Sequence, residues 1–392
     1  MRILHIIPSY YPAFRFGGPI HSVHLLNKTV VKKGIQVDIL TTNAGLNEKQ
    51  KVQILRQAQD DKERWNDVDG VRVKYVSFVG YEHFNFSLSF VRELKKIIRD
   101  YDLVHITAIW NFPVLVGAYF CNKHSIPHII SPRGAVNFEA IIDRKKNIKN
   151  FYYKFFLKKV FRNAVFHFTS SLDYMRFIEY NKEDIKHIII PNGFEVGLYD
   201  KNKIQGKKII EGKYILYLGR INRLKGLELL IRAFNKIHKK YSNVSLIFAG
   251  PDNDQYKSTL FKIIKELSLE NRAIFLGLLN FDEKLNAIYN CEFLVLPSYS
   301  ENFGNVVIEA LLCKKTVIIG KNVGVRDEIS DNNAGLIVDY NENELASAME
   351  HLLDDASYRN NLADNGFNYS QKFYDINTVT DRFINEYEKI IK

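Results

Sequence analysis

Short, almost continuously hydrophobic runs alternate with amphipathic stretches along the whole chain. The amphipathic stretches have apolar residues at helical spacing and predict helices, for example over residues 18–33, 226–241 and 305–313. The hydrophobic runs are rich in β-branched and aromatic residues and predict buried strands. These strands are expected at residues 2–8, 36–42, 71–79, 103–106, 128–131, 165–170, 187–191, 214–218, 245–249, 273–276, 293–297, 316–319 and 335–338.

This alternation predicts the domain organisation. Buried strands separated by helices are typical of parallel sheets covered on both faces, and the two series each approach half of the 392 residues. We therefore expect two doubly wound α/β domains, residues 1–195 and 206–373, joined by a polar stretch. An amphipathic helix over residues 374–392 follows. Residues 47–69 are highly polar and are expected to form a mobile excursion between strands.

Composition excludes several protein classes. A hydrophobic fraction of 46% with 25% charged residues is ordinary for a globular protein and excludes a disordered or collagen-like chain. The three cysteines form no Cys-x-x-Cys pair, so neither a disulfide framework nor a zinc site is expected. No run approaches the roughly 20 apolar residues of a membrane span. The N-terminus reads as a strand and not as a signal peptide, so we expect a cytoplasmic protein.

Charge is distributed unevenly. The chain carries a formal charge of +11, and residues 1–200 hold 29 Lys and Arg against 19 Asp and Glu. This half is expected to face something anionic. In residues 144–162 cations and aromatics alternate at roughly helical spacing, which is typical of helices that lie in a membrane interface. A solvated helix with its aromatic side in the core explains the same pattern equally well.

The richest candidate motif follows a predicted strand. Residues 297–310 read PSYSENFGNVVIEA, in which Glu301 stands in a loop, a helix begins near Gly304, and Glu309 falls within that helix. Glycine lets the backbone approach a ligand, and the free amides of a helix N-terminus suit a diphosphate. The two carboxylates suit the hydroxyls of a polyol. Read alone, the pair is better explained without a function, with Glu301 as a helix-entry residue and Glu309 as a surface charge.

Two other strand–helix turns are candidates for phosphate binding. Residues 218–226 carry Arg220, Arg223 and Lys225 directly after a strand, where cations can contact a diphosphate. Gly17 and Gly18 open the first long helix. They do not form Gly-x-Gly-x-x-Gly, and the chain has no Walker sequence, so neither an NAD-binding Rossmann site nor a P-loop is expected.

Taken in order, these motifs resemble one family. The Gly17-Gly18 turn, Pro191-Asn192-Gly193, Gly219-Arg220 with Lys225-Gly226, and Glu301-x7-Glu309 are similar to the retaining glycosyltransferases of family 4, of the envelope-polysaccharide type. The resemblance covers nearly the whole chain. It implies the GT-B fold, with two Rossmann-like domains facing a central cleft and a C-terminal helix crossing back to the first domain. The N-terminal domain would bind the acceptor and the C-terminal domain the nucleotide sugar.

The resemblance also implies roles for individual residues. Arg220 and Lys225 would bind the donor diphosphate and stabilise the leaving group, and Glu301 would hold hydroxyls of the transferred sugar; these three are the predicted catalytic residues. Glu309 would bind the ribose. The predicted donor-binding set is completed by Gly17, Gly18, Asn302, Phe303, Gly304 and Asn305, with Gly18 contributing from the opposite domain. No metal and no further cofactor are expected.

The acceptor side departs from the family. Many members carry a histidine there, whereas the comparable loop here reads Ile130-Ser131-Pro132-Arg133-Gly134-Ala135. Arg133 is a candidate for contact with donor phosphate or an anionic acceptor. His105, at a predicted strand end, is a second candidate, and a hydrogen-bonded structural histidine is an equally open alternative. Asn192 is expected to shape the turn at the domain exit.

The resulting hypothesis is a retaining, metal-independent hexosyltransferase. It would move a sugar from a UDP- or GDP-linked donor to a glycan acceptor, expected to be lipid-linked, in cell-surface polysaccharide biosynthesis. The expected location is the cytoplasm, with docking on the anionic inner face of the plasma membrane. Two alternatives remain: a sugar-nucleotide epimerase of the same fold, and a non-catalytic, basic nucleic-acid-binding protein. No helix-turn-helix, zinc or stacking motif supports the second alternative.

Overall fold

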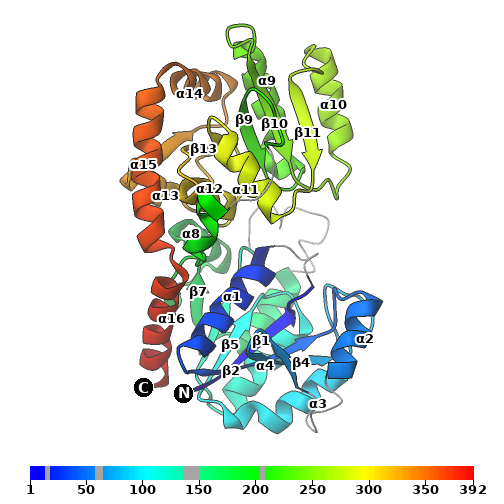
Figure 1. Cartoon of the computed structure of the whole chain (residues 1–392). Coiled ribbons are helices and arrows are strands. Elements are labelled where there is room, and N and C mark those ends of the chain that lie inside the picture. Colours follow the sequence, from blue (N-terminus) through cyan, green and yellow to red (C-terminus); the bar gives the residue numbers. More distant parts are fainter. Residues whose placement is uncertain (14–17, 58–64, 136–149, 204–207) are drawn as a thin grey trace. The chain divides into compact units, whose positions relative to one another are not determined.

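The computed structural model describes residues 1–13, 18–57, 65–135, 150–203 and 208–392. The chain divides into two compact units, of which unit 1 holds residues 1–194 and 376–392 and unit 2 holds residues 195–375 (Figure 1). Each unit is built around its own sheet. The predicted α/β class with two Rossmann-like domains is confirmed.

Unit 1 contains an eight-stranded sheet with the order β3-β4-β2-β1-β5-β6-β7-β8. Neighbouring strands are parallel except for β3, which pairs antiparallel with β4. The strands are β1 (Arg2–Ser9), β2 (Gln36–Thr42), β3 (Asn66–Val68), β4 (Val71–Val76), β5 (Leu103–Thr107), β6 (His128–Ser131), β7 (Val165–Phe168) and β8 (His187–Ile189).

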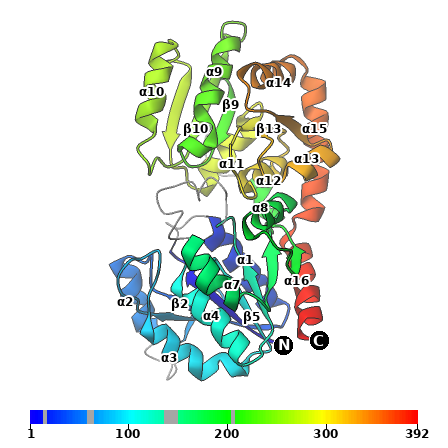
Figure 2. The same ribbon diagram turned by 180° about the vertical axis from the view of Figure 1, so that it is seen from behind.

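Helices cover both faces of this sheet, and each face has its own hydrophobic cluster. On one face, α1 (Gly18–Lys32) packs beside α16 (Ile376–Ile391), which contributes Phe383 and Tyr387 to the cluster. Figures 1 and 2 show α16 (red) alongside the N-terminal elements although it is the last helix of the chain. The other face is covered by α3 (Leu88–Ile97), α4 (Phe112–Lys123) and α8 (Ser171–Asn181), together with the helical segment of residues 150–160, which ends in α7 (Lys158–Val160).

Unit 2 contains a six-stranded, entirely parallel sheet with the order β11-β10-β9-β12-β13-β14. Its strands are β9 (Lys213–Leu218), β10 (Val244–Ala249), β11 (Ala273–Gly277), β12 (Leu294–Leu296), β13 (Val317–Gly320) and β14 (Gly335–Val338). Its α-helices are α9 (Leu227–Ile237), α10 (Lys257–Glu266), α11 (Phe281–Asn290), α12 (Asn305–Leu312), α13 (Arg326–Asp331), α14 (Glu342–Asp354) and α15 (Ala356–Phe373).

The strand orders locate the points where each sheet changes direction. In unit 1, the strands that follow β1 lie on one side of it up to β4, and β5 pairs with the opposite edge of β1. In unit 2, β10 and β11 lie on one side of β9, and β12 lies on the other. Ligands of open α/β sheets bind beyond the carboxyl ends of the strands at such a switch point. The loops after β9 and β12 are the ones in which the sequence places Arg220, Lys225 and Glu301.

The interpretation of residues 47–69 as a mobile excursion was wrong for the described part of that segment. Residues 48–57 form helix α2 (Glu48–Gln57), and 66–68 form β3. Asp69 and Gly70 both have positive φ, +55° and +85°, and join β3 to β4 in a tight hairpin. An Asp-Gly pair with this geometry is a favoured hairpin turn. The polar composition hid these elements because both lie at the margin of the unit.

No helix within the described ranges combines the length and the hydrophobicity that a membrane span requires.

Candidate functional site

The loops after β9 and β12 are fastened to each other. The backbone amide of Tyr299 donates to the carbonyl of Leu224 over 2.9 Å. Gly226 ends the turn formed by Arg223–Lys225 with a φ of +67°, and a Cβ there would overlap the carbonyl oxygen of Pro297. Only glycine permits this approach at this backbone conformation. The turn that carries the cations is therefore fixed on the loop that carries Glu301.

Lys225 and Glu301 form an ion pair across these two loops. Lys225 is 9% exposed, so its ammonium is largely withdrawn from water and directed at the carboxylate. Arg220, in contrast, is exposed and forms no ion pair within the described residues. Its carbonyl accepts a hydrogen bond of 2.7 Å from the Tyr217 hydroxyl, which holds the loop backbone at the end of β9. The β9 loop thus offers one buried, paired cation, Lys225, and two exposed cations, Arg220 and Arg223.

A third loop, after β13, holds the backbone of Glu301. The amide of Glu301 donates to Asn322 over 3.2 Å, and the amide of Gly324 donates to the Glu301 carbonyl over 3.1 Å. A Cβ on Gly324 would overlap the carbonyl oxygen of Asn302, so this packing requires glycine. Three loops from adjacent strands therefore share one backbone network around Glu301.

Helix α12 begins directly after this network. Its N-cap is Gly304, which has a φ of +98° and no side chain of its own to cap the first turn. Phe303 is buried and packs edge-on against Tyr374 at 5.9 Å, while Asn302 and Asn305 are partly exposed. The first amides of an α-helix have no partner within the helix, and they carry its partial positive charge. The helix end can therefore accept an anion beside Glu301.

Glu309 lies further along α12 and is 9% exposed. Its Oε1 accepts a hydrogen bond of 2.7 Å from Lys284 on α11. Its Oε2 is buried and accepts no hydrogen bond from any described residue. A buried carboxylate oxygen with no donor costs free energy, so this atom is suited to a ligand hydroxyl.

Burial and the charge of Glu309 together raise the pKa of two neighbouring groups, Tyr199 and Cys313. Burial, and next the negative charge of Glu309, raise the pKa of the Tyr199 hydroxyl well above its ordinary value. The same two causes, in the same order, raise the pKa of the Cys313 thiol. Both groups therefore stay protonated and neutral at physiological pH, which leaves Lys284 as the cation paired with Glu309.

In unit 1, the β1–β5 switch point is occupied by buried histidines. Nδ1 of His105 lies 2.8 Å from the Tyr387 hydroxyl, and its Nε2 lies 2.7 Å from Ser131 Oγ. Ser131 Oγ lies 2.7 Å from His167, whose other ring nitrogen contacts the Ile190 carbonyl at 2.8 Å. His105 is fully buried and both of its ring nitrogens are engaged. These contacts match the structural histidine that the sequence left open as an alternative.

His5 stacks on His105 with ring centroids 4.4 Å apart and interacts with Asn27 and Thr107. Burial lowers the pKa of His5 to about 4 and that of His167 to about 3, and it lowers the pKa of His105 well below its usual value. All three imidazoles are therefore neutral at pH 7. They form a polar layer within the sheet that also binds α16 through Tyr387.

Sequence comparisons assign both units to glycosyltransferases. Residues 16–197 match the profile of Glycosyltransferase Family 4, and residues 200–369 match Glycosyl transferases group 1. This chain belongs to the family 4 glycosyltransferases. Both family models are those of glycosyltransferases, so they favour glycosyl transfer over the epimerase and nucleic-acid-binding alternatives that the sequence left open.

Individual relatives of this glycosyltransferase agree with the assignment. An uncharacterized glycosyltransferase of Methanocaldococcus jannaschii is 29% identical over 340 residues, covering 79% of this chain and 87% of the relative. A Campylobacter jejuni N-acetylgalactosamine-N,N'-diacetylbacillosaminyl-diphospho-undecaprenol 4-alpha-N-acetylgalactosaminyltransferase is 34% identical over 152 residues, or 38% of this chain and 40% of that protein. The structure of Anabaena HepE in complex with UDP-glucose superimposes with a TM-score of 0.74 at 19% identity, covering 99% and 100% of the two chains. The predicted GT-B fold is thereby confirmed.

On the predicted acceptor side of this glycosyltransferase, Arg133 is held in an unusual conformation. Its φ is +52°, and its guanidinium donates to the Asn192 side chain over 2.5 Å. Its Nε is buried and makes no hydrogen bond with the described residues. Burial lowers the pKa of Arg133 to about 10, so the group remains a cation at pH 7. Asn192 therefore helps to position Arg133 in addition to standing in the turn where the sequence placed it.

The structure brings together the candidates of unit 2 and adds one residue. Arg220, Lys225, Glu301 and the α12 N-terminus lie on adjacent loops, with Glu309 further along the same helix. Gly18 opens α1 in unit 1, and Gly17 lies outside the described residues. Lys284 was missed because no motif marks it: it comes from a helix outside the recognised segments.

Proposed function

We propose that this glycosyltransferase transfers a sugar, with retention of anomeric configuration, from a nucleoside-diphosphate sugar to a glycan acceptor. One observation carries the proposal. At the β9–β12 switch point, a cation–carboxylate pair adjoins a helix N-terminus that begins at a glycine. The same helix carries a buried carboxylate whose Oε2 accepts no hydrogen bond from the described residues. Cations and amides suit the diphosphate, and the carboxylates suit sugar and ribose hydroxyls.

Arg220 and Lys225 act on the diphosphate in this proposal. Breaking the bond between the sugar and the diphosphate produces a cationic sugar and an anionic leaving group. Fixed cations lower the barrier most where that negative charge develops. Lys225 is already oriented by Glu301 and by the Gly226 contact, so little reorganisation is needed. Exposed Arg220 can contact the diphosphate bidentately.

Glu301 and Glu309 recognise hydroxyl groups. Glu301 would accept hydrogen bonds from the transferred sugar, while Lys225, held beside it, would contact the phosphate. Glu309 would accept a ribose hydroxyl at Oε2, because Oε1 is occupied by Lys284. The backbone amides at Gly304 and Asn305 would contact the diphosphate, with Asn302 and Phe303 shaping the loop. Gly18, which the sequence also predicts to bind the donor, would contact it through its backbone.

The proposed reaction needs no metal ion. The bond from the anomeric carbon to the phosphate oxygen breaks, and the acceptor oxygen forms a new bond on the face that the diphosphate leaves. The departing diphosphate oxygen takes the acceptor proton. Transfer should therefore persist in EDTA, and activity that is lost with EDTA and restored by a divalent ion would overturn this part of the proposal.

The acceptor proposed is a lipid-linked glycan in cell-surface polysaccharide biosynthesis. The name of the Campylobacter relative specifies a diphospho-undecaprenol acceptor, which supports this choice. Arg133 is the proposed contact for an anionic group of the acceptor, because its buried Nε makes no hydrogen bond with the described residues. The enzyme would act on the cytoplasmic side of the membrane, docking through the 144–162 segment, of which residues 144–149 lie outside the described residues.

A UDP- or GDP-linked donor is proposed, and the complex of HepE with UDP-glucose favours UDP.

A thermal-shift panel of UDP, GDP and ADP sugars tests the donor site. One nucleotide should raise the unfolding midpoint of the wild type, because ligand binding to the native state stabilises it. The rise should vanish in Glu309→Ala and persist in Glu270→Ala, a variant at an exposed position of the same unit. The proposed donor site is contradicted if no nucleotide shifts the wild type, or if Glu309→Ala keeps the full shift.

A further inference from the structure

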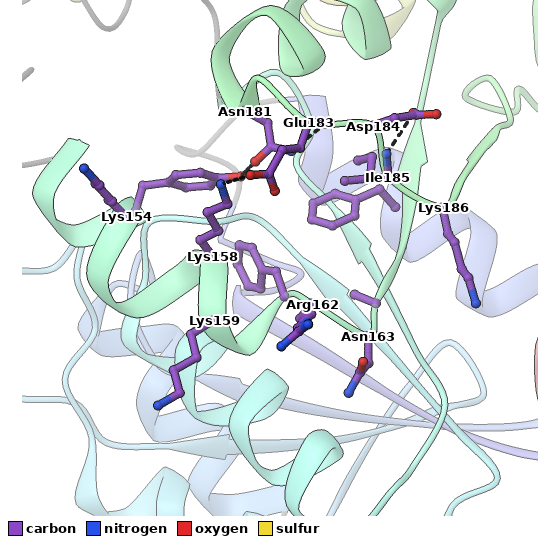
Figure 3. Close-up of a pocket in the computed structure, with 14 residues that line it drawn as sticks. Lys154, Lys158, Lys159, Arg162, Asn163, Asn181, Glu183, Asp184, Ile185 and Lys186 are labelled. Carbon is purple, nitrogen blue, oxygen red and sulfur yellow. Dashed lines mark hydrogen bonds and ion pairs between the residues drawn. The ribbon is translucent and has the colours of Figure 1, made fainter.

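A cavity of about 720 Å³ opens on unit 1 at the β7–β8 edge of its sheet, in a part of the fold that contains none of the proposed donor residues (Figure 3). One wall is the helical segment that ends in α7, and the other is the turn between α8 and β8. Cations from both walls line it: Lys154, Lys158, Lys159, Arg162 and Lys186.

The positive charge of this cavity is only partly compensated. Lys158, on the helical wall, pairs with Glu183, on the opposite wall, over 2.6 Å, and Figure 3 draws this contact as a dashed line. The other carboxylate, Asp184, accepts hydrogen bonds from the Ile185 amide and the Tyr174 hydroxyl, and these bonds lower its pKa. The remaining four cations form no ion pair within the described residues. A bound anion would reduce the repulsion among the uncompensated charges of this lining.

Three phenylalanines lie on the same helical segment as these cations. Phe151, Phe155 and Phe156 are 56%, 59% and 47% exposed. Tyr153 and Leu157, in contrast, are buried and anchor the segment in the core of unit 1. Among the described residues, the aromatic face formed by these three phenylalanines is therefore left uncovered. A cluster of large exposed apolar side chains marks an interaction surface.

The combination of these two features selects the partner. We propose that the cavity binds the phosphate-bearing headgroup of an anionic phospholipid while Phe151, Phe155 and Phe156 insert into the same leaflet. Interfacial helices combine buried aromatic side chains with Lys and Arg that contact anionic lipid. The rings of Phe151 and Phe155 pack against each other with centroids 4.6 Å apart and form a compact apolar cap, so that each ring has at most one open face for a nucleic-acid base to stack on.

This inference deepens the proposed membrane docking and rests on it. Sequence spacing indicated only that residues 144–162 could face a membrane. The tertiary structure adds Lys186 from the turn between α8 and β8 and places it with Arg162 in the lining of one cavity. It also separates the outward Phe151 and Phe155 from the inward Tyr153, which spacing alone left undivided.

Flotation of the full-length protein with vesicles tests the site. The wild type should float with vesicles of phosphatidylcholine and phosphatidylglycerol and should not float with phosphatidylcholine alone. Lys159→Glu/Arg162→Glu should weaken binding about tenfold or more, since each cation near an anionic surface contributes roughly a factor of five. Phe151→Ser/Phe155→Ser should weaken it at both low and high salt. The control Lys262→Glu/Lys265→Glu, at exposed positions of unit 2, should bind like the wild type.

Further arms separate the other ligands. Inorganic phosphate at millimolar concentration should not displace the vesicles, and competition by it would show a soluble-phosphate site and overturn the lipid assignment. Binding of single-stranded RNA that is stronger than vesicle binding and lost in the same variants would overturn it in favour of nucleic acid. Equal flotation of all variants would overturn it as well. The nucleotide-induced thermal shift is measured on each variant, so that loss of donor binding is distinguished from loss of docking and misfolded variants are recognised.

Discussion

Nζ of Lys284 lies 2.7 Å from Oε1 of Glu309 and joins α11 to α12, while Oε2 of the same carboxylate has no hydrogen-bond donor among the described residues. The contact holds the orientation of the Glu309 carboxylate. Lys284 is therefore a positioning residue for the oxygen that is proposed to receive the ribose.

Replacing this lysine should weaken nucleotide binding. In Lys284→Met the carboxylate loses a charge-assisted hydrogen bond of about 1.5–3 kcal/mol and can rotate, so we expect the dissociation constant for the nucleoside diphosphate to rise about tenfold. Calorimetric titration measures it. Lys236→Met removes an exposed partner of Glu342 and should leave the constant unchanged. Unaltered affinity in Lys284→Met would show that the pair only stabilises the fold.

Lys225 should act mainly on the chemical step. With the donor found in the thermal-shift panel, Lys225→Ala should lower kcat by about 100-fold to 1,000-fold, as expected for a fixed group that stabilises charge developing on a leaving group. Release of nucleoside diphosphate measures the rate. Lys239→Ala, at an exposed position of the same unit, is the matched control. A rise in KM at constant kcat would assign Lys225 to ground-state binding only.

The contact of Gly226 with Pro297 should be costly to disturb. Gly226→Ala meets both a φ of +67° and an overlap with the Pro297 carbonyl oxygen, whereas Gly212→Ala meets a φ of +80° with open space around it. Strain of this kind costs about 1–3 kcal/mol, and overlap adds to it. We expect the unfolding midpoint to fall by roughly 5 °C or more for Gly226→Ala and by about 2–4 °C for Gly212→Ala. Equal shifts in calorimetry would mean that the loop moves away freely.

The buried histidines should make unit 1 sensitive to acid. In the unfolded chain these imidazoles titrate near their ordinary value of about 6.5. Burial lowers the pKa of His5 to about 4 and of His167 to about 3 in the native state. The unfolded state therefore binds protons that the native state excludes, and the free energy of unfolding falls as pH drops from about 6.5 toward 4. A histidine such as His5 contributes about 2 kcal/mol of this loss by pH 5.

Urea unfolding at pH 7.5, 6.5 and 5.5 measures that slope. His105→Gln removes one excluded proton from the cluster and should make the slope shallower, although the variant is less stable at pH 7.5. His187→Gln, at an exposed position of β8, controls for the loss of an imidazole as such. Identical slopes in the wild type and His105→Gln would contradict the assignment of the acid sensitivity to this cluster.

Some residues of the candidate site could be recognised from the sequence, and others only from the structure. Glu301 and Glu309 were recognisable because one segment carries both, and Arg220 and Lys225 because they follow a strand within a short motif. Lys284 and Tyr199 reach Glu309 from α11 and from the chain before β9, and no spacing links them to it. His105 illustrates the reverse case: its place at a strand end suggested an acceptor role, while the structure engages both of its ring nitrogens.

By itself, the sequence determined the two α/β units, the family and the loops that are proposed to bind the donor. These follow from local information, because hydrophobic periodicity and glycine-containing turns act over a few residues. Only the tertiary structure decided that Lys225 pairs with Glu301, that Lys284 holds Glu309, and that Arg162 and Lys186 share a cavity. Such pairings depend on the order of strands in each sheet, since parallel strands bring distant loops to one edge, and no local pattern specifies that order.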